Sequence, residues 1–441
     1  MESLDRWIDR QYRQAAQSML ASISATGVVK ARPGFGQLIA PKPGSIVASP
    51  IPASYDPDPD YFFHWYRDSA LIIDALRLLH LDQGAGRIAP VQFADFVRFS
   101  LSLRQIDGRA LVASATWRDK VVPDFKKFLR SDVELAAVHG DSVSAETRVN
   151  PDGSPDISSW PRPQHDGPAM RALTLLRWCA SARLESELAE AVAQLLRFDL
   201  AYTRARWREP CFDIWEEDLG LHYYTLCVSA AALAAGAAWL AQRADDSEAQ
   251  TTAAEAQAIR RSLDDFWLAD AGYYRSRQLA SGARSGKELD ISVILAAIHA
   301  EEHQAGAHSV HDERMHATLA KLEALFDADY RINHERAREC GPAMGRYAGD
   351  RYYSGGAYYF STLGAAEFCF RAARGSAHGN DLRQRGDAYL ETVRRFTPAS
   401  GDLSEQFDQN TGEQSSAKHL AWSYAAFISC IGARRAVSGH G

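Results

Sequence analysis

Apolar and polar positions along the chain define about twelve helical segments of two kinds. In the first kind, apolar residues recur on a single face, as in residues 3–24 and 184–206. This pattern is typical of a helix that covers a core. In the second kind nearly every side is apolar, as in residues 223–240 and 290–299. Because a helix without a polar face belongs inside a protein, the pattern predicts an inner and an outer set of helices.

The two kinds of helix alternate along the chain, with six of each. The amphipathic segments are residues 3–24, 91–106, 184–206, 248–268, 311–326 and 380–396. The apolar segments begin near residues 67, 168, 223, 290, 355 and 416. Strand-like runs do not alternate with these helices, which disfavours a parallel α/β barrel. We therefore expect an all-α protein with the (α/α)6 barrel fold, six inner helices inside six outer ones, as a single domain over residues 1–441.

The links between the helices are asymmetric. Links from an outer helix to the next inner helix are long and carry most of the clustered aromatic and charged residues, namely residues 60–68, 159–167, 211–218, 285–290, 341–356 and 401–416. In the expected barrel all six would meet at the N-termini of the inner helices. Polar groups from distant parts of the chain would then converge on one concave site. The irregular stretch 107–166 is also long enough to be a functional loop.

Glu216 and Glu217 stand directly before the most apolar helix, residues 223–240. A helix N-terminus favours negative charge, whereas apolar surroundings raise the pKa of a carboxyl group. Such a position suits a general acid. The alternative is that both glutamates only complement the helix dipole.

Cleavage of an acetal by side chains alone needs a second carboxylate, which activates water or attacks the sugar. Glu405 is the best candidate because it lies in another converging loop, just before the last inner helix. Four other carboxylates lie at similar positions and are further candidates for this role: Asp68, Asp166, Asp290 and Asp408. Their alternative role is to cap or anchor inner helices.

Further residues in the converging loops are suited to holding a sugar. Guanidinium and carboxylate groups can bind hydroxyls, and the candidates are Arg67, Asp68, Arg162, Asp166 and Arg346. Ion pairs are the alternative role of these arginines. Aromatic side chains offer apolar platforms for ring faces, and the candidates are Trp65, Trp160, Trp215, Tyr353, Tyr358 and Trp422. Core packing is the alternative for each.

Composition excludes several other classes of protein. The net charge is −7, and no concentrated basic patch indicates nucleic acid. We expect no membrane segment, because the apolar run 228–240 is too short. The fourteen histidines and six cysteines form no zinc pattern, and no phosphate or dinucleotide motif occurs, so we expect no metal and no cofactor. The scattered cysteines and a start without a signal sequence predict a cytoplasmic protein. We further expect a monomer.

Six segments of the chain resemble, in order, the catalytic domain of glucoamylases, glycoside hydrolase family fifteen, most closely its fungal branch. They are GSIVASP with DYFFHWYRDSALI, SWPRPQHDGPAMRAL, DIWEED, GRYAGDRYYSGGAYYFSTLGAAE and LSEQFDQNTGEQSSAKHLAWSYAAFI. The resemblance implies an inverting, exo-acting enzyme that removes glucose from the non-reducing ends of α-1,4-glucans such as maltodextrin, glycogen or soluble starch.

The resemblance also implies roles for single residues. Glu216 matches the general acid and Glu405 the general base, while Glu217 matches a substrate-binding carboxylate. Arg67, Asp68 and Arg346 match hydrogen-bonding residues of the innermost sugar site. Tyr61 matches a tyrosine near the catalytic water, and Trp160 an aromatic lid. Ser416 matches a serine that hydrogen-bonds the base.

The chain departs from the fungal pattern at two positions. Tyr358 stands where tryptophan is usual, and His165 where arginine is usual. These changes concern outer substrate binding, so they leave α-1,6 and trehalose linkages open as alternatives. We expect no starch-binding module and no β-sandwich domain in the 441 residues. A catalytically silent glucan-binding protein on the same fold is the alternative from another class. A helical-repeat scaffold is disfavoured because the loops vary too much in length.

Overall fold

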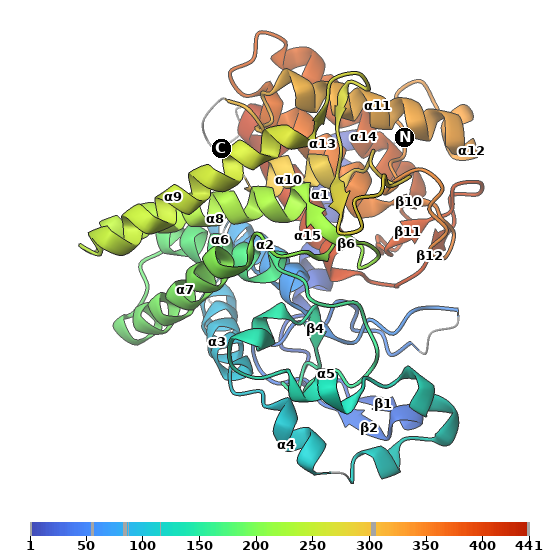
Figure 1. Cartoon of the computed structure of the whole chain (residues 1–441). Coiled ribbons are helices and arrows are strands. Elements are labelled where there is room, and N and C mark those ends of the chain that lie inside the picture. Colours follow the sequence, from blue (N-terminus) through green and yellow to red (C-terminus); the bar gives the residue numbers. More distant parts are fainter. Residues whose placement is uncertain are drawn as a thin grey trace.

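Six helices form a closed ring in the computed structural model, which describes residues 2–53, 57–82, 86, 88–114, 116–300 and 306–438 (Figure 1). Each packs against the next one along the chain, and the last packs against the first. The ring helices are α2 (Tyr66–Leu81), α6 (Asp166–Ser181), α8 (Tyr223–Ala241), α10 (Ser292–Ala300), α13 (Tyr359–Ala373) and α15 (Ala421–Ser438). These are the six segments whose sequences are apolar on nearly every side.

Six further helices surround the ring, and each packs against one of its members. They are α1 (Leu4–Leu20), α3 (Ile88–Leu103), α7 (Ser186–Arg206), α9 (Asp246–Leu263), α11 (Glu313–Asp329) and α14 (Gly379–Phe396). Their exposed faces are polar, because only one stripe of each is needed to cover the ring. The expected (α/α)6 barrel is confirmed. Three short helices in the loops were not expected: α4 (Gly108–Ala113), α5 (Asp132–Ala136) and α12 (Arg331–His334).

Short antiparallel strands fasten the long loops to one another. One pair joins β1 (Lys30–Arg32) to β2 (Gln37–Ile39), a second joins β3 (His64–Trp65) to β4 (Arg148–Val149), and a third joins β7 (Trp267–Leu268) to β8 (Tyr273–Tyr274). Two three-stranded sheets are β5 (Cys211–Phe212), β6 (Leu219–His222) and β9 (Arg277–Leu279), and β10 (Ala357–Tyr358), β11 (Gln406–Phe407) and β12 (Gln414–Ser415). Strands β3, β6 and β10 each run directly into an inner helix, so they set where that helix begins.

Two helix starts differ from the prediction, and a preceding strand accounts for the first of them. The sequence pattern places the fifth and sixth inner helices from residues 355 and 416, whereas they begin at Tyr359 and Ala421. Residues 357–358 pair with 406–407 as strands instead. The chain is extended there because the pairing supplies backbone hydrogen bonds that a helix would otherwise provide.

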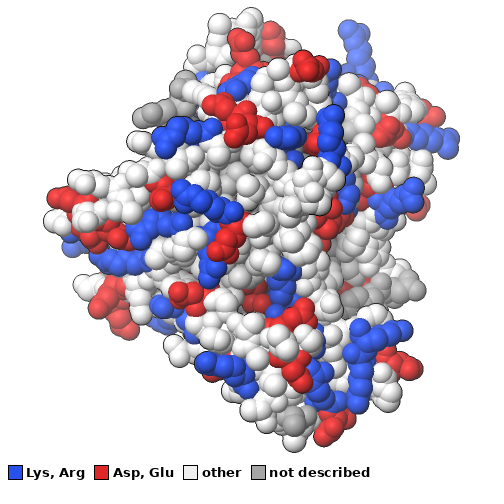
Figure 2. Space-filling model, in the orientation of Figure 1, with Lys and Arg blue, Asp and Glu red and all other residues white. Residues whose placement is uncertain are grey.

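Helix α8 is long and apolar enough to span a membrane by length and composition alone, so the expectation that no such run occurs is wrong for this segment. Its most apolar window is 78% buried within the barrel. The burial identifies α8 as a core helix of the ring. Figure 2 shows acidic and basic side chains interspersed over the face in view, without a continuous basic area there.

Candidate active site

A cavity of about 220 Å³ lies where the N-terminal ends of the inner helices meet the long loops. Ligand pockets typically measure about 300–1,000 Å³, so this one is suited to a small ligand unit. Phe360 and Trp422 stack in parallel on one side of it, with ring centroids 4.1 Å apart. The polar and charged side chains that line it are Tyr61, Trp65, Arg67, Asp68, Trp160, Trp215, Glu216, Glu217, Arg346, Tyr352 and Glu405.

Glu216 is held by two indole groups. The Nε1–H of Trp65 donates to one carboxyl oxygen at 2.8 Å, and that of Trp160 donates to the other at 2.5 Å. Burial raises the pKa of Glu216 to about 6, against the opposing effect of nearby Arg67. Its backbone is left-handed, with φ 65°, in the turn that precedes β6. The carboxyl group is therefore fixed in orientation and can keep its proton near neutral pH.

Glu405 lies in the loop before β11 and is 8% exposed. The hydroxyl of Ser416 donates to its Oε2, and that of Tyr61 to its Oε1 at 3.4 Å. Burial raises the pKa of Glu405 to about 7, while the bond from Ser416 and the charge of Arg346 favour the ionised form. Ser416 lies behind Glu405 and does not line the cavity.

The two raised pKa values define how the pair titrates. Between pH 6 and pH 7 the pair mainly carries one proton, on either Glu216 or Glu405. The form with protonated Glu216 and ionised Glu405 can give a proton to a leaving oxygen and activate water at once.

Glu217 is bound by three donors that converge on it. Arg346 donates to Oε1 at 3.0 Å, whereas the Tyr347 hydroxyl and the Lys287 ammonium group donate to Oε2 at 2.5 and 2.7 Å. Arg346 is itself held by Asp350, at 2.6 Å from both Nε and Nη2. This network fixes the Glu217 carboxyl group at the cavity edge, where it can accept a hydrogen bond from a ligand hydroxyl.

Arg67 joins the first turn of α2 to that of α6. Its guanidinium donates to Asp68 and to Asp166, at 3.1 Å each, and lies 3.8 Å from Glu216. Asp166 is fully buried and does not line the cavity, so it anchors Arg67 instead of meeting a ligand. Burial raises the pKa of Asp68, which does line the cavity. Asp290 caps the start of α10, which is the alternative role considered for it, because its side chain accepts a hydrogen bond from the Ser292 N–H at 2.7 Å.

Arg162 was expected to hold sugar hydroxyls, but the structure places it outside the cavity lining. Its guanidinium donates to Glu146 at 2.9 Å and to Asp156 at 3.2 Å, and also to the Trp160 carbonyl at 2.7 Å. It belongs to a buried ion-pair network beneath Trp160. The guanidinium of Arg148 also lies 3.6 Å from the centre of the Trp160 ring. The irregular stretch 107–166 thus positions Trp160 against Glu216.

Two predicted aromatic platforms are also outside the cavity lining. Tyr353 is 39% exposed and stacks edge-on against Tyr352, with ring centroids 4.8 Å apart. Tyr358 is fully buried, and its hydroxyl donates to Asp350 at 3.2 Å and accepts from Gln406 at 2.7 Å. His165, the other departure from the fungal pattern, is buried 2.9 Å from the Tyr202 hydroxyl. Tyr358 and His165, which were expected to affect outer substrate binding, are thus both buried and do not line the cavity.

The sequence alone did not predict several residues of the site. Tyr352 lines the cavity, and its hydroxyl lies 2.7 Å from that of Tyr61. Tyr347, Lys287 and Asp350 complete the network around Glu217. The clustered aromatic and charged residues of 341–356 were a usable signal for this loop. In an irregular loop, however, no periodicity tells which of two adjacent tyrosines faces inward.

Among the described residues, no group of three or more histidine, cysteine, aspartate or glutamate side chains could hold a metal ion. None of the six cysteines forms a disulfide, and four of them are buried.

A pair of carboxyl groups in one cavity, with their pKa values raised, is typical of glycoside hydrolases. The sequence comparison agrees, because the profile described as glycosyl hydrolases family 15 matches residues 17–380 and 375–432. The chain therefore belongs to this family.

Curated relatives match nearly the whole chain. Glucoamylase 1 of Rhizopus oryzae is 26% identical over 97% of this chain and 70% of its own length. A probable glucoamylase of Schizosaccharomyces pombe is 27% identical over 99% of this chain and 93% of its own length. Among solved structures, the glucoamylase from Saccharomycopsis fibuligera has a TM-score of 0.78 and 22% identity, with 100% of this chain and 97% of that chain covered. This likeness supports the barrel fold.

Proposed function

We propose that the protein is an exo-acting glucoamylase, which hydrolyses α-1,4-glucosidic bonds at the non-reducing ends of glucans and releases β-glucose. The observation that carries the proposal is that Glu216 and Glu405 line the same small cavity, each largely shielded from solvent and each with a raised pKa. The curated relatives named glucoamylase support the same activity.

The proposed mechanism uses the two glutamates in one displacement. Glu216, oriented by the indoles of Trp65 and Trp160, protonates the leaving glycosidic oxygen. Glu405, held by Ser416, takes a proton from water as that water attacks the anomeric carbon from the opposite face of the ring. A single displacement inverts the configuration, so an α-linked substrate yields β-glucose. Arg67, Asp68, Glu217 and Arg346 hold the hydroxyl groups of the terminal sugar.

The test is glucose release from maltose, maltoheptaose, isomaltose, trehalose and glycogen, with NMR detection of the first anomer formed. We expect β-glucose from the maltosaccharides. Glu216→Gln and Glu405→Gln should each lower kcat by about 10²–10⁴-fold, the usual contribution of a general acid or base. Glu413→Gln, at an exposed position in the same loop as Glu405, is the matched control and should keep full activity.

Each other result has a defined meaning. α-Glucose as the first product would overturn the inverting mechanism. Release from isomaltose or trehalose alone would move the proposal to those linkages. No glucose from any substrate, together with retained maltoheptaose binding, would favour the silent glucan-binding protein.

We also propose that the protein works as a cytoplasmic monomer on maltodextrin or glycogen. None of the six cysteines forms a disulfide, as is usual in a reducing compartment. One relative, 24% identical over 96% of this chain, is named an intracellular sporulation-specific glucoamylase of Saccharomyces cerevisiae. Light scattering during size-exclusion chromatography and fractionation of the source cells test these two points.

A further inference from the structure

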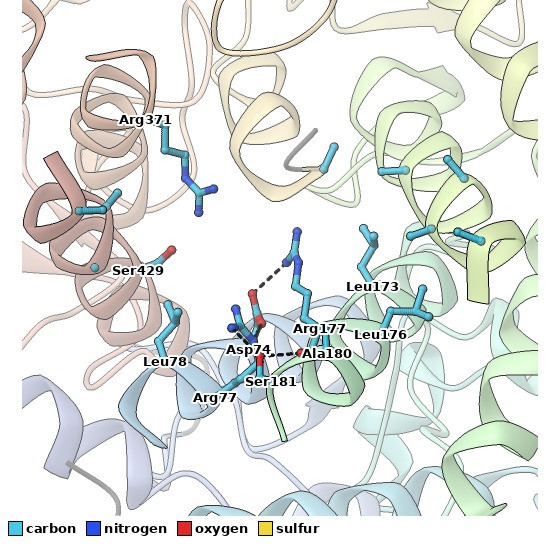
Figure 3. A pocket seen from close by; sticks show the side chains of 18 of the residues that line it. Asp74, Arg77, Leu78, Leu173, Leu176, Arg177, Ala180, Ser181, Arg371 and Ser429 are labelled. Atoms are coloured by element: carbon cyan, nitrogen blue, oxygen red, sulfur yellow. Dashed lines mark hydrogen bonds and ion pairs between the residues drawn. The ribbon is translucent and has the colours of Figure 1, made fainter. Parts of the chain in front are cut away.

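Arginines of this barrel differ in what surrounds their guanidinium groups. At the end of the barrel opposite the active site, Arg77 and Arg177 both donate to Asp74, at 2.7 and 2.9 Å. They line a cavity of about 870 Å³, and their shared carboxylate joins α2 to α6 (Figure 3). Next to the active site, Arg148 of β4 has a different setting, because aromatic rings as well as a carboxylate surround its guanidinium.

Three rings lie around the guanidinium of Arg148, which is 1% exposed. Its Cζ is 4.0 Å from the ring centroid of Phe63, 4.9 Å from that of Trp65 and 3.6 Å from that of Trp160. A guanidinium attracts aromatic faces, and the attraction is stronger where water is excluded. Both indoles line the active-site cavity, whereas Arg148 does not. Arg148 therefore binds the two indoles from outside the cavity.

These two indoles are the groups that hold Glu216. The Nε1–H of Trp65 donates to Oε1 of the carboxyl group, and that of Trp160 donates to Oε2. Trp65 lies in β3, directly opposite Arg148 in the β3–β4 pair, so the backbone places these two residues side by side. Trp160 lies in the loop that leads to α6 and is partly exposed. One guanidinium thus connects the two hydrogen-bond donors of the carboxyl group.

Arg148 is itself fixed in position. Its Nε donates to Asp156 at 2.9 Å, and its Nη2 donates to the Ser158 hydroxyl at 3.3 Å. Asp156 also accepts from Arg162 at 3.2 Å. The alternative is that Arg148 serves only as the ion-pair partner of Asp156. An ion pair accounts for the bond to Asp156, but it does not require that the guanidinium lie against both indoles.

We propose that Arg148 is a positioning residue for the general acid, because its guanidinium holds the indoles of Trp65 and Trp160 where they donate to Glu216. The inference rests on the proposed function, in which Glu216 protonates the leaving oxygen. Without the guanidinium, the indole of Trp160 loses the group on which it stacks, and the carboxyl group loses a fixed donor. A displacement of about 1 Å at a catalytic group can lower the rate by about 10²-fold.

Arg148→Lys tests the proposal, because lysine keeps the charge but has no planar group that can lie along two rings. The variant and the wild-type full chain are compared on maltose and on α-glucosyl fluoride. The leaving oxygen of maltose needs a proton, whereas fluoride leaves without one, so only maltose reports on the general acid. We expect kcat on maltose to fall by about 10–10²-fold. On the fluoride it should fall by less than about threefold.

Arg130→Lys is the matched control. Arg130 is also buried in the ion-pair network beneath Trp160, where it donates to Glu146 at 2.8 Å, but its guanidinium lies over none of the described rings. This variant should change kcat by less than about twofold on either substrate. Urea unfolding of both variants measures the stability cost that the two substitutions share. In a Trp160→Phe background Arg148→Lys should cost less than in the wild type, since one of the two donors is already absent.

Three results would overturn the inference alone, with the wild-type protein active: equal losses on maltose and the fluoride, an equal loss in Arg130→Lys, or unchanged kcat of Arg148→Lys on maltose. A wild-type protein that releases glucose from neither substrate would overturn the proposed function, and this inference with it.

Discussion

At the scale of single residues, the pH dependence of activity follows from Glu216 and Glu405. Adding a proton to Glu405 removes the base, and removing the proton from Glu216 removes the acid. With pKa values of about 6 and about 7, kcat/KM should fall on the acid side of pH 6 and on the alkaline side of pH 7. A pH profile of kcat/KM on maltoheptaose checks this. A maximum far below pH 6 would contradict the raised pKa values.

The hydroxyl of Ser416 should matter most at low pH. It donates to Glu405 and favours the ionised form, so Ser416→Ala raises the pKa of that carboxyl. We expect kcat/KM to fall by about tenfold below pH 6, where ionised Glu405 is scarce, and by progressively less toward alkaline pH.

Ser415→Ala is the control for this experiment, because the Ser415 hydroxyl bonds Ser354 instead of the base. A loss of the same size at every pH would show that Ser416 acts only through local structure.

At the scale of elements, the start of α6 lies directly against the start of α2. A Cβ added to Gly167 would lie 2.6 Å from the Tyr66 Cβ and 3.5 Å from the Arg67 amide nitrogen. Gly167→Ala should therefore separate the two helix ends and lower the free energy of unfolding by about 1–3 kcal/mol. It should also lower kcat, because Arg67 depends on its bond to Asp166 across this contact. Urea unfolding and steady-state kinetics measure the two effects.

Gly286→Ala is the matched control, since its added Cβ meets no described heavy atom within 4 Å. Unchanged stability and activity of Gly167→Ala would mean that the α2–α6 contact is not tight.

The helices were predictable from sequence because burial on all sides and burial on one side leave different patterns. The apolar stretch 290–299 predicts an inner helix, regardless of which elements it packs against. The strands were not predictable, because residues 357–358 pair with 406–407 far along the chain. The two catalytic candidates came from position and resemblance. Neither position nor resemblance predicted the roles of Arg162 and Tyr358, because tertiary packing determines that they contact Asp156 and Asp350, respectively.

At the scale of the whole molecule, the ring of inner helices is complete only when α15 packs against both α13 and α2. A chain ending at residue 400 lacks α15 and the loop that carries Glu405. We expect this truncated chain to have no cooperative thermal transition, because the apolar faces of α2 and α13 lose their cover. Near-UV circular dichroism and calorimetry check this, with the full chain as reference. A cooperative transition in the truncated chain would show that the ring need not close.

The contact between α15 and α2 also affects biosynthesis. About 340 residues separate Leu81, the end of α2, from Ala421, the start of α15. At about 5–20 residues per second, a ribosome needs roughly 20–70 s to make them. During that time one apolar side of α2 has no partner, and such surface invites aggregation or capture by chaperones. Glu405 also lies shortly before α15 along the chain, so the nascent chain gains its catalytic base and the helix that closes the ring almost together.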